Sequence, residues 1–440
     1  MKTSNLTKAV ALASFAFAGQ AFALAPTVTP DLVVNISGAS AQQLTMGHIL
    51  KKFCNNDLDT YLDKPTTGSA GSAYRSYFCT ISSDPLINAP ANLVGKKVLF
   101  NTRAKGGSVW GVVPLGRGWN VQYLNIGYNG GSHCSLTATN TYECTYTSPS
   151  TALLSDGECP KDSVDYSAQD RQTKCVRSDA GVSDVEPAMF VNSNLPAGWS
   201  ALTASELGGL AVSSEYGVVF GVAVTNDVYA ALQNMQGLSG TQVPSLTKAQ
   251  ITGILTGGIK SWKELDTFLT TAPASTSYPI SSSATSGFMS VCRRANGSGT
   301  QAAQNAFFLN APCASGFGVN ASMVTASASS STYKVLENSS AGAVGDCLNK
   351  SVTAGALVGS GTAKFGGIGL MAIEKQPTAS DKWKYIKIDG VEPTVDNAIS
   401  TAYNNVFEQT LQWPSTTSGD TLEALQMLLQ ASGDPAILNA

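Results

Sequence analysis

The residues with the clearest chemical potential form one segment, Arg294–Thr300, with the sequence RANGSGT. Apolar residues at helical spacing follow it, which predicts a turn that leads into a helix at 301–310. The start of a helix exposes unpaired N–H groups and a partial positive charge, so it favours an anion. Ser298 and Thr300 add hydroxyl donors, the glycines allow close backbone approach, and Arg294 supplies a guanidinium. The segment predicts an anion-binding turn, although a plain capped helix would use the same residues.

Two other short turns carry a hydroxyl directly after a predicted strand. The apolar run Leu32–Ile36 leads into the turn Gly38–Ser40, and the run Lys97–Phe100 precedes the turn Gly106–Ser108. A later segment, Ser183-Asp184, brings a carboxylate. Hydroxyls and backbone amides with one guanidinium are the groups that hold a small oxyanion. These turns are therefore candidates for the same site.

These turns need a framework, and hydrophobic periodicity predicts its elements. Apolar residues at helical spacing follow the first turn, so strand, turn and helix form the βα unit of a parallel sheet. Further strands are expected at Val218–Val224, Gly366–Met371 and 385–388, and further helices at Leu246–Leu255, Tyr403–Trp413 and Leu422–Leu429. A chain of 440 residues exceeds one ordinary domain. The sequence thus predicts an α/β fold with at least two lobes.

Two long polar segments interrupt this pattern, at about 54–92 and 117–175. Both contain cysteines and many hydroxyl or amide side chains. We expect both to be surface insertions, the first irregular and the second rich in β-strand, and either could hold a partner site.

The beginning of the chain predicts export. Lys2 and Lys8 precede an apolar stretch that ends in the small-residue motif Ala21–Ala23, which is the pattern of a signal peptide over residues 1–23. No later apolar run is long enough to predict a membrane span. The mature chain is therefore expected to be soluble and periplasmic or secreted.

All nine cysteines lie beyond this leader, and an oxidising compartment would let them pair. If neighbours in sequence pair, Cys347 is left over, or it replaces one of the partners. The four expected pairs are Cys54–Cys79, Cys134–Cys144, Cys159–Cys175 and Cys292–Cys313.

The order of these segments resembles that of the periplasmic phosphate-binding component of bacterial ABC importers, and of the related secreted phosphate-binding proteins of the DING type. Gly38–Ser40 is similar to the Gly-Ala-Thr turn that opens this family. Gly106–Ser108 and Ser183-Asp184 are similar to its Gly-Ser-Gly and Ser-Asp segments. Leu246–Trp262 resembles its helix and Gly-x-Ile-x-x-Trp segment. Arg294–Thr300 matches its Arg-x-x-x-Ser-Gly-Thr turn without a gap.

This resemblance implies a type II periplasmic-binding-protein fold, in which two α/β lobes enclose a ligand cleft and close about a hinge. Lobe I would comprise residues 24–224 and 363–440, and lobe II residues 225–362. The resemblance also implies inorganic phosphate as the ligand, an ABC permease as the partner, and a monomer without a cofactor or metal. The expected phosphate ligands are Ser40, Ala41, Ser108, Asp184, Arg294, Ser298, Gly299 and Thr300.

A carboxylate in an anion site requires an explanation, because like charges about 4 Å apart repel by several kcal/mol when poorly solvated. Asp184 fits if the ligand carries a proton that this carboxylate accepts. Phosphate carries such a proton at neutral pH and sulfate does not. Leaving a buried carboxylate without a donor costs roughly 1–3 kcal/mol, so Asp184 is expected to select phosphate over sulfate.

Other classes of function fit less well. A net charge of −3 with 13% charged residues gives no electrostatic footprint for nucleic acid. A phosphatase would need a nucleophile with a base or clustered metal ligands, whereas His48 and His133 stand apart. We therefore expect no enzymatic activity. One alternative stays open, a secreted adhesive or interaction protein that keeps the phosphate-binding fold but serves no transporter.

Overall fold

The structure is a computed structural model that describes residues 24–40, 43–64, 70–146, 159, 172–268, 287–312, 323–326, 330, 332–357 and 363–438. Its strands are β1 (Leu32–Gly38), β2 (Asp59–Lys64), β3 (Tyr74–Thr80), β4 (Lys97–Arg103), β5 (Asn120–Leu124), β6 (Cys134–Ala138), β7 (Thr141–Thr145), β8 (Thr173–Arg177), β9 (Ala180–Ser183), β10 (Leu210–Thr225), β11 (Ser245–Leu246), β12 (Met289–Arg294), β13 (Tyr333–Asn338), β14 (Gly366–Ala372), β15 (Trp383–Ile388) and β16 (Val406–Pro414).

The helices are α1 (Gln43–Lys52), α2 (Val113–Arg117), α3 (Ala204–Gly208), α4 (Asn226–Met235), α5 (Lys248–Leu255), α6 (Gly299–Leu309), α7 (Ala341–Ser351), α8 (Val395–Ile399), α9 (Gly419–Ser432) and α10 (Pro435–Leu438). Short 3₁₀ helices lie at Ser108–Gly111, Tyr128–Gly131, Pro187–Met189, Asn192–Asn194 and Trp262–Phe268.

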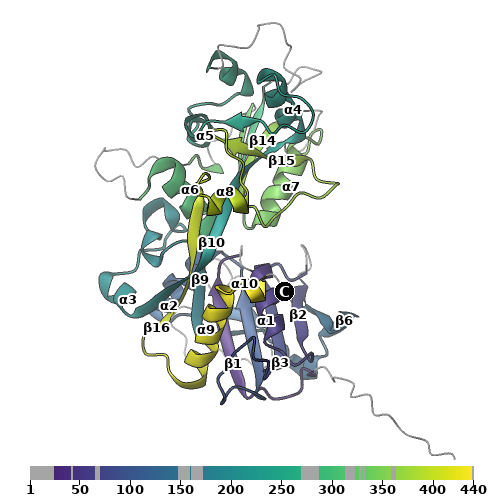
Figure 1. Cartoon of the computed structure of the whole chain (residues 1–440), viewed down its shortest axis with the longest axis vertical. Helices are drawn as coiled ribbons and strands as arrows, with labels where there is room; N and C mark the ends of the chain where they lie inside the picture. The colour runs from purple at the N-terminus through teal and green to yellow at the C-terminus, as the bar shows by residue number, and fades with distance from the viewer. Residues whose placement is uncertain are drawn as a thin grey trace, which may run out of the picture.

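The molecule is a mixed α/β protein with two lobes stacked along its long axis (Figure 1). One path of hydrogen-bonded strands runs through both lobes, in the order β13-β12-β14-β10-β16-β9-β1-β4-β3-β2-β7-β6. The first half of β10 pairs with β16, and its second half pairs with β14 and β15. This long strand therefore belongs to the sheet of both lobes. The predicted α/β fold class is confirmed.

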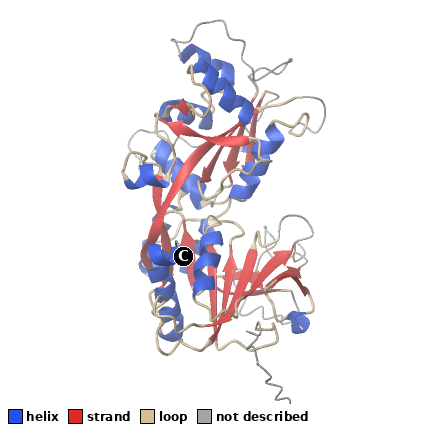
Figure 2. Cartoon of the chain, turned by 45° about the vertical axis from the view of Figure 1, so that its right-hand side comes forward, coloured by secondary structure: helices blue, strands red, loops and turns tan. Residues whose placement is uncertain are grey.

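Lobe I contains a parallel core of three strands, in which β1 lies between β4 and β9. Helices α1, α9 and α10 cover one face of this sheet, as Figure 2 shows. Buried residues of the sheet and of these helices form one apolar cluster, to which α1 contributes Ile49 and α9 contributes Leu425. Apolar spacing of this kind is what the sequence predicted for α1 and α9.

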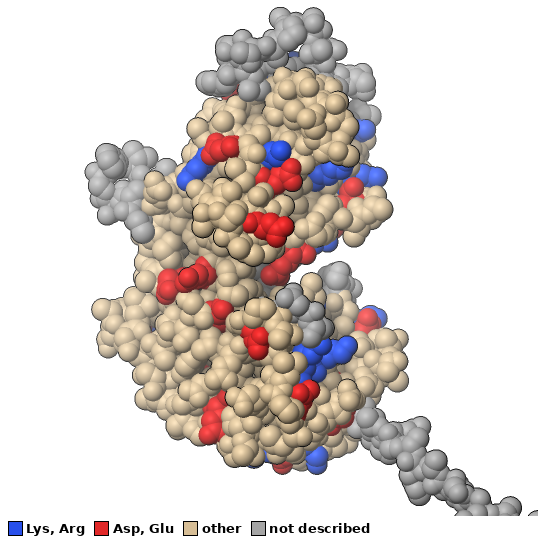
Figure 3. Space-filling model, in the orientation of Figure 1, with Lys and Arg blue, Asp and Glu red and all other residues tan. Residues whose placement is uncertain are grey.

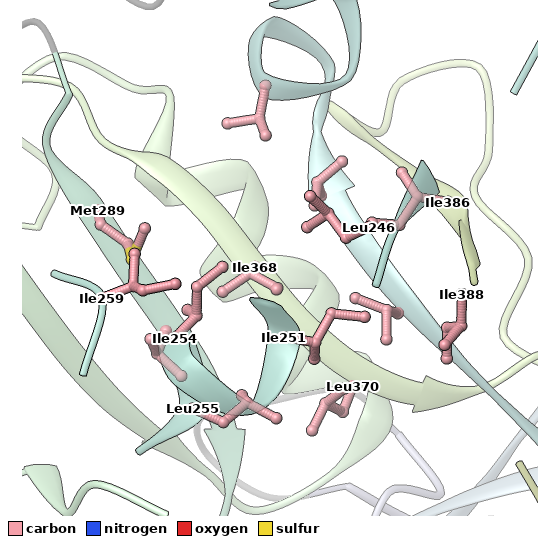
Figure 4. Packing of buried hydrophobic residues seen from close by; sticks show 14 of the residues in the cluster. Leu246, Ile251, Ile254, Leu255, Ile259, Met289, Ile368, Leu370, Ile386 and Ile388 are labelled. Atoms are coloured by element: carbon pink, nitrogen blue, oxygen red, sulfur yellow. The ribbon is translucent and has the colours of Figure 1, made fainter. Parts of the chain in front are cut away.

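Lobe II has β12 at its centre, paired in parallel with β13 and β14. Its apolar cluster joins α5 to the strands, and Figure 4 shows how these side chains pack. The side chains labelled there are Leu246, Ile251, Ile254, Leu255, Ile259, Met289, Ile368, Leu370, Ile386 and Ile388.

The structure corrects the expected lobe boundary. Residues 363–440 were assigned to lobe I, yet β14 pairs with β12 and β15 pairs with the lobe II half of β10. The apolar side chains of β14 and β15 also belong to the lobe II cluster. Lobe II therefore continues to the start of β16, because β14 and β15 are part of its sheet.

Two predictions of secondary structure are wrong. The segment Tyr403–Trp413 was expected to be a helix, but residues 406–414 form strand β16 between β9 and β10. Its apolar spacing suits a strand that is buried on both faces as well as a helix. The first presumed insertion, 54–92, is not irregular throughout, because β2 and β3 extend the lobe I sheet next to β4. The second contains β5 to β8 in its described part, in agreement with the expected β-rich segment.

Three of the expected disulfides are present, Cys54–Cys79, Cys134–Cys144 and Cys159–Cys175. The fourth expected pair is wrong, because Cys292 bonds to Cys347 instead of Cys313. This bond ties β12 to α7, which packs against it. Cys313 lies outside the described residues, as does the predicted signal peptide. None of the helices in the described part of the chain has the length and apolar character needed to cross a membrane.

Candidate anion-binding site

The predicted site residues lie at the ends of strands that point towards the boundary between the lobes. Ser40 follows β1, Ser108 follows β4, and Asp184 follows β9. These three strands are parallel neighbours, so their carboxyl ends meet at one edge of the lobe I sheet. Arg294 is the last residue of β12 in lobe II, and the N-terminus of α6 follows it after a short turn.

Arg294 connects the two lobes. Its side chain is buried, and Nη2 donates to Ser40 Oγ in lobe I at 3.1 Å and to the carbonyl of Ser339 in lobe II at 3.0 Å. Its Nη1 lies 3.4 Å from Thr300 Oγ1. The Nε–H group is buried and has no acceptor within the described part of the chain. A guanidinium has five N–H groups, so these contacts leave donors of Arg294 available for an anion.

Asp184 is equally buried and lies on the other side of Thr300. Its Oδ2 accepts from Thr300 Oγ1 at 3.1 Å, and its Oδ1 accepts from Gln409 Nε2 at 3.1 Å. Burial raises the pKa of this carboxyl above its ordinary value, while the charge of Arg294 and these two hydrogen bonds oppose the rise. Arg294 and Asp184 are thus linked through the Thr300 hydroxyl.

Burial also lowers the pKa of the Arg294 guanidinium to about 10, and the charge of Asp184 works against this shift. A guanidinium with a pKa of about 10 is fully protonated at neutral pH. The site therefore holds one permanent cation beside a carboxyl whose proton is held more tightly than usual.

The start of α6 packs tightly against the second hydroxyl turn. The Ser298 hydroxyl caps α6 by accepting from Gln301 N at 3.4 Å. A Cβ added to Gly299 would clash with Ser108 Oγ and lie 2.8 Å from Asp184 Cβ. A Cβ on Gly107, which has a φ of +80°, would lie 3.2 Å from the Ser298 Cα. Glycine at both positions is what lets the helix start approach lobe I this closely.

The structure thus brings seven of the eight predicted residues together, and the eighth, Ala41, lies outside the described residues. Hydrogen bonds join five of these residues, between Arg294 and Ser40, Arg294 and Thr300, Thr300 and Asp184, and the Ser108 hydroxyl and Asp184 N at 3.3 Å. The other two, Ser298 and Gly299, pack against the turn that contains Ser108.

One residue beside the site, Gln409, was not predicted from the sequence. Gln409 is fully buried on β16, opposite a bulge in β10 at Glu215 and Tyr216. Two residues of β10 face one residue of β16 there, which is the geometry of a β-bulge and can redirect a side chain. Gln409 was not proposed as a site residue because its segment was predicted to be a helix.

A cavity of about 270 Å³ adjoins these residues. Ser40 lines it from lobe I, together with Arg75, and Ser340 and Glu374 line it from lobe II. Figure 3 shows the surface hollowed between the two halves of the molecule on its right-hand side. Burial and the charge of Asp184 raise the pKa of the Glu374 carboxyl to about 7.

Comparisons with known proteins find similar structures but no similar sequences. No family model matches the sequence, and no curated protein matches it at the sequence level. A putative phosphate ABC transporter substrate-binding protein from Clostridium perfringens, solved with bound phosphate, is 14% identical, with 91% of this chain and 94% of that chain covered and a TM-score of 0.43.

PstS from Borrelia burgdorferi is 11% identical, with 93% of this chain and 96% of that chain covered and a TM-score of 0.38. A DING protein is 14% identical over 57% of this chain and 70% of that chain, with a TM-score of 0.34. The resemblance inferred from the sequence motifs is to the same group of proteins.

Proposed function

We propose that this protein is an exported solute-binding protein that captures inorganic phosphate between its lobes. The observation that carries this proposal is the buried Arg294 guanidinium, which contacts Ser40 in one lobe and Ser339 in the other while its Nε–H has no acceptor among the described residues. A buried cation with an unused donor is costly unless a ligand completes its shell.

The groups around Arg294 suit a small tetrahedral oxyanion. The hydroxyls of Ser40 and Thr300 lie within hydrogen-bond distance of the guanidinium, and the Ser108 hydroxyl lies beside Asp184 and the first residue of α6. These hydroxyls and the N-terminus of α6 are neutral groups that suit an anion. In this proposal the ligands are Ser40, Ala41, Ser108, Asp184, Arg294, Ser298, Gly299 and Thr300.

In this proposal Asp184 makes the site prefer phosphate to sulfate. Its carboxylate now accepts from Thr300 and Gln409. With phosphate bound, it would also accept the proton of the ligand, which sulfate lacks at neutral pH. The lobes would deliver phosphate to an ABC permease or retain it outside the cell, and the disulfides and predicted leader suit either location.

The first test is titration calorimetry with inorganic phosphate on the wild-type protein and on Arg294→Ala. We expect the substitution to remove roughly 3–5 kcal/mol of binding free energy at most, because it deletes a charge-assisted contact in a buried site. Arg117→Ala is the matched control, since Arg117 pairs with Glu206 in lobe I and contacts none of the site residues named above.

Circular dichroism and thermal unfolding would establish that both variants are folded. If folded Arg294→Ala titrates phosphate like the wild type, Arg294 is not a ligand. If the wild-type protein takes up no phosphate, the proposed function is wrong.

A further inference from the structure

The cavity beside Arg294 is larger than a single tetrahedral oxyanion requires. Its volume of about 270 Å³ is many times the roughly 10–15 Å³ that a cavity needs to hold one water molecule. Residues of both lobes line its wall. Arg75, near the start of β3, comes from lobe I, and Lys375, which follows β14, comes from lobe II. A ligand group could therefore extend from the anion site without displacing the fold.

Two contacts link the wall of the cavity to the anion site. Ser40, which accepts from Arg294 Nη2, is itself a wall residue. The same Nη2 donates to the carbonyl of Ser339, and the next residue, Ser340, lines the cavity from lobe II. The guanidinium thus contacts a wall residue on one side and the chain next to a wall residue on the other.

The charges of the wall favour an anion. Arg75 and Lys375 contribute two cations against the single carboxyl of Glu374, whose pKa is raised to about 7. The first turn of α7, with Ser340 as its N-cap, also lies in the wall and adds a partial positive charge.

Donors in the wall are held in place or lack a partner. Arg75 Nε donates to the carbonyl of Gly71 at 2.8 Å, which fixes the guanidinium against the loop. Gln43 also lines the cavity, and its Nε2 is buried without an acceptor in the described part of the chain. A second acidic group on the ligand would use the Gln43 amide and the remaining N–H groups of Arg75.

We propose that the preferred ligand is a condensed phosphate, with one phosphoryl group at Arg294 and a second in the cavity near Arg75 and Lys375. This inference rests on the proposed function, because it needs an oxyanion at Arg294. It deepens that function by naming pyrophosphate as the smallest ligand with both groups.

The test compares inorganic phosphate, pyrophosphate and glycerol 3-phosphate by titration calorimetry at fixed ionic strength. On the wild-type protein, pyrophosphate should bind at least as tightly as phosphate and more tightly than glycerol 3-phosphate. Arg75→Gln and Lys375→Gln should each weaken pyrophosphate roughly tenfold, the loss expected for one charge-assisted contact, while phosphate binding changes less than twofold.

Two variants control this experiment. Arg75→Lys keeps the charge and should recover most of the affinity for pyrophosphate. Lys387→Gln removes a lysine that pairs with Glu392 in lobe II, outside the cavity wall, and should leave both anions unaffected.

The outcomes separate this proposal from the previous one. Phosphate binding with no pyrophosphate binding overturns the condensed-phosphate assignment and leaves the phosphate site intact. Equal weakening of both anions by Arg75→Gln, or tighter binding of glycerol 3-phosphate than of pyrophosphate, also overturns it. If none of the three ligands binds the wild-type protein, the phosphate site itself is wrong.

Discussion

At the scale of single residues, Asp184 and Arg294 place opposite charges at two buried positions of the site. Burial disfavours the charged form of both groups, raising the pKa of the Asp184 carboxyl and lowering that of the Arg294 guanidinium. Each charge partly offsets the cost of the other. Breaking such a buried pair by removing one partner destabilises more than the pair contributes, so substitutions here must be judged by binding and by stability together.

Asp184→Asn should change which anion binds. The amide can donate to an unprotonated oxygen but no longer offers a carboxylate to the proton of phosphate, so sulfate should become measurable and phosphate should weaken. Calorimetry with both anions measures the ratio of their affinities. An unchanged preference for phosphate over sulfate would remove Asp184 from the selectivity mechanism.

A second readout for Asp184→Asn is the pH dependence of stability without anion. A carboxyl whose pKa is higher in the folded chain contributes stability that is complete at acid pH and is lost as the pH rises through the folded pKa. The amide does not titrate, so the variant should gain stability relative to the wild type as the pH rises from about 4 towards neutral. A constant difference between pH 4 and 8 would contradict the raised pKa.

The site residues could be predicted from the sequence to a large extent, because their chemistry is local. Glycine, hydroxyl and arginine within seven consecutive residues indicate an anion turn before any fold is known. Gln409 could not be found in this way. Its place beside Asp184 depends on a bulge and on the pairing of β16 with β9, which brings together residues more than 200 positions apart.

At the scale of elements, the start of α6 sets the spacing between the lobes. Gly299 is the first residue of this helix, and its Cα faces Ser108 and Asp184 without room for a side chain. The turn after β4 and the N-terminus of α6 therefore pack closely against each other. A hydrogen bond from Val109 N to the carbonyl of Gly297, at 2.9 Å, joins them.

Gly299→Ala should push α6 away from lobe I. The added methyl group overpacks a buried contact, for which the usual cost is about 1–3 kcal/mol, and phosphate binding should weaken because Thr300 moves with the helix. Denaturant unfolding and calorimetry measure the two effects. Gly208→Ala is a matched control, because it lies at the end of helix α3 with open space around its Cα.

The control should be neutral or slightly stabilising, since alanine is the better helix former. If Gly299→Ala behaves like Gly208→Ala, the close approach of α6 to lobe I is not required.

Elements with one buried face were easier to predict than elements buried on both faces. Helices α1, α5 and α9 show the 3.6-residue spacing that the sequence analysis used, and each was expected near its observed bounds. Strand β16 has a run of buried polar and apolar residues, Gln409 to Trp413, between two partner strands. Burial on both sides removes the alternation that identifies a strand.

At the scale of the whole molecule, the Cys292–Cys347 bond supports both halves of the proposed site. It joins β12, which ends at Arg294, to α7, whose first turn lines the cavity. Replacing both cysteines by serine should lower the free energy of unfolding by roughly 2–4 kcal/mol, because the bond closes a long loop of the unfolded chain.

Denaturant unfolding of the Cys292→Ser, Cys347→Ser variant measures this loss. The matched control replaces Cys134 and Cys144, which are only 10 positions apart and join β6 to β7 at the edge of the sheet. That variant should lose less stability and keep its phosphate affinity. Equal losses in the two double variants would contradict the larger stabilisation expected from the longer loop.

The architecture of two lobes was predictable from the sequence, but their boundary was not. Where a lobe ends depends on which strands pair across long distances, and β14 and β15 return to β10 after about 140 residues. The spacing of apolar residues along the sequence does not indicate which distant strands will pair. The same reason explains the wrong partner for Cys292, since pairing of neighbours ignores that α7 folds back on β12.

Strand β10 also limits how this protein can be taken apart. Its 16 residues complete one sheet with their first half and another with their second half. A gene fragment that stops anywhere within it would leave one of the two sheets without a central strand. Neither half of the molecule is an autonomous module, and any engineered split, fusion or exchange must carry the whole strand.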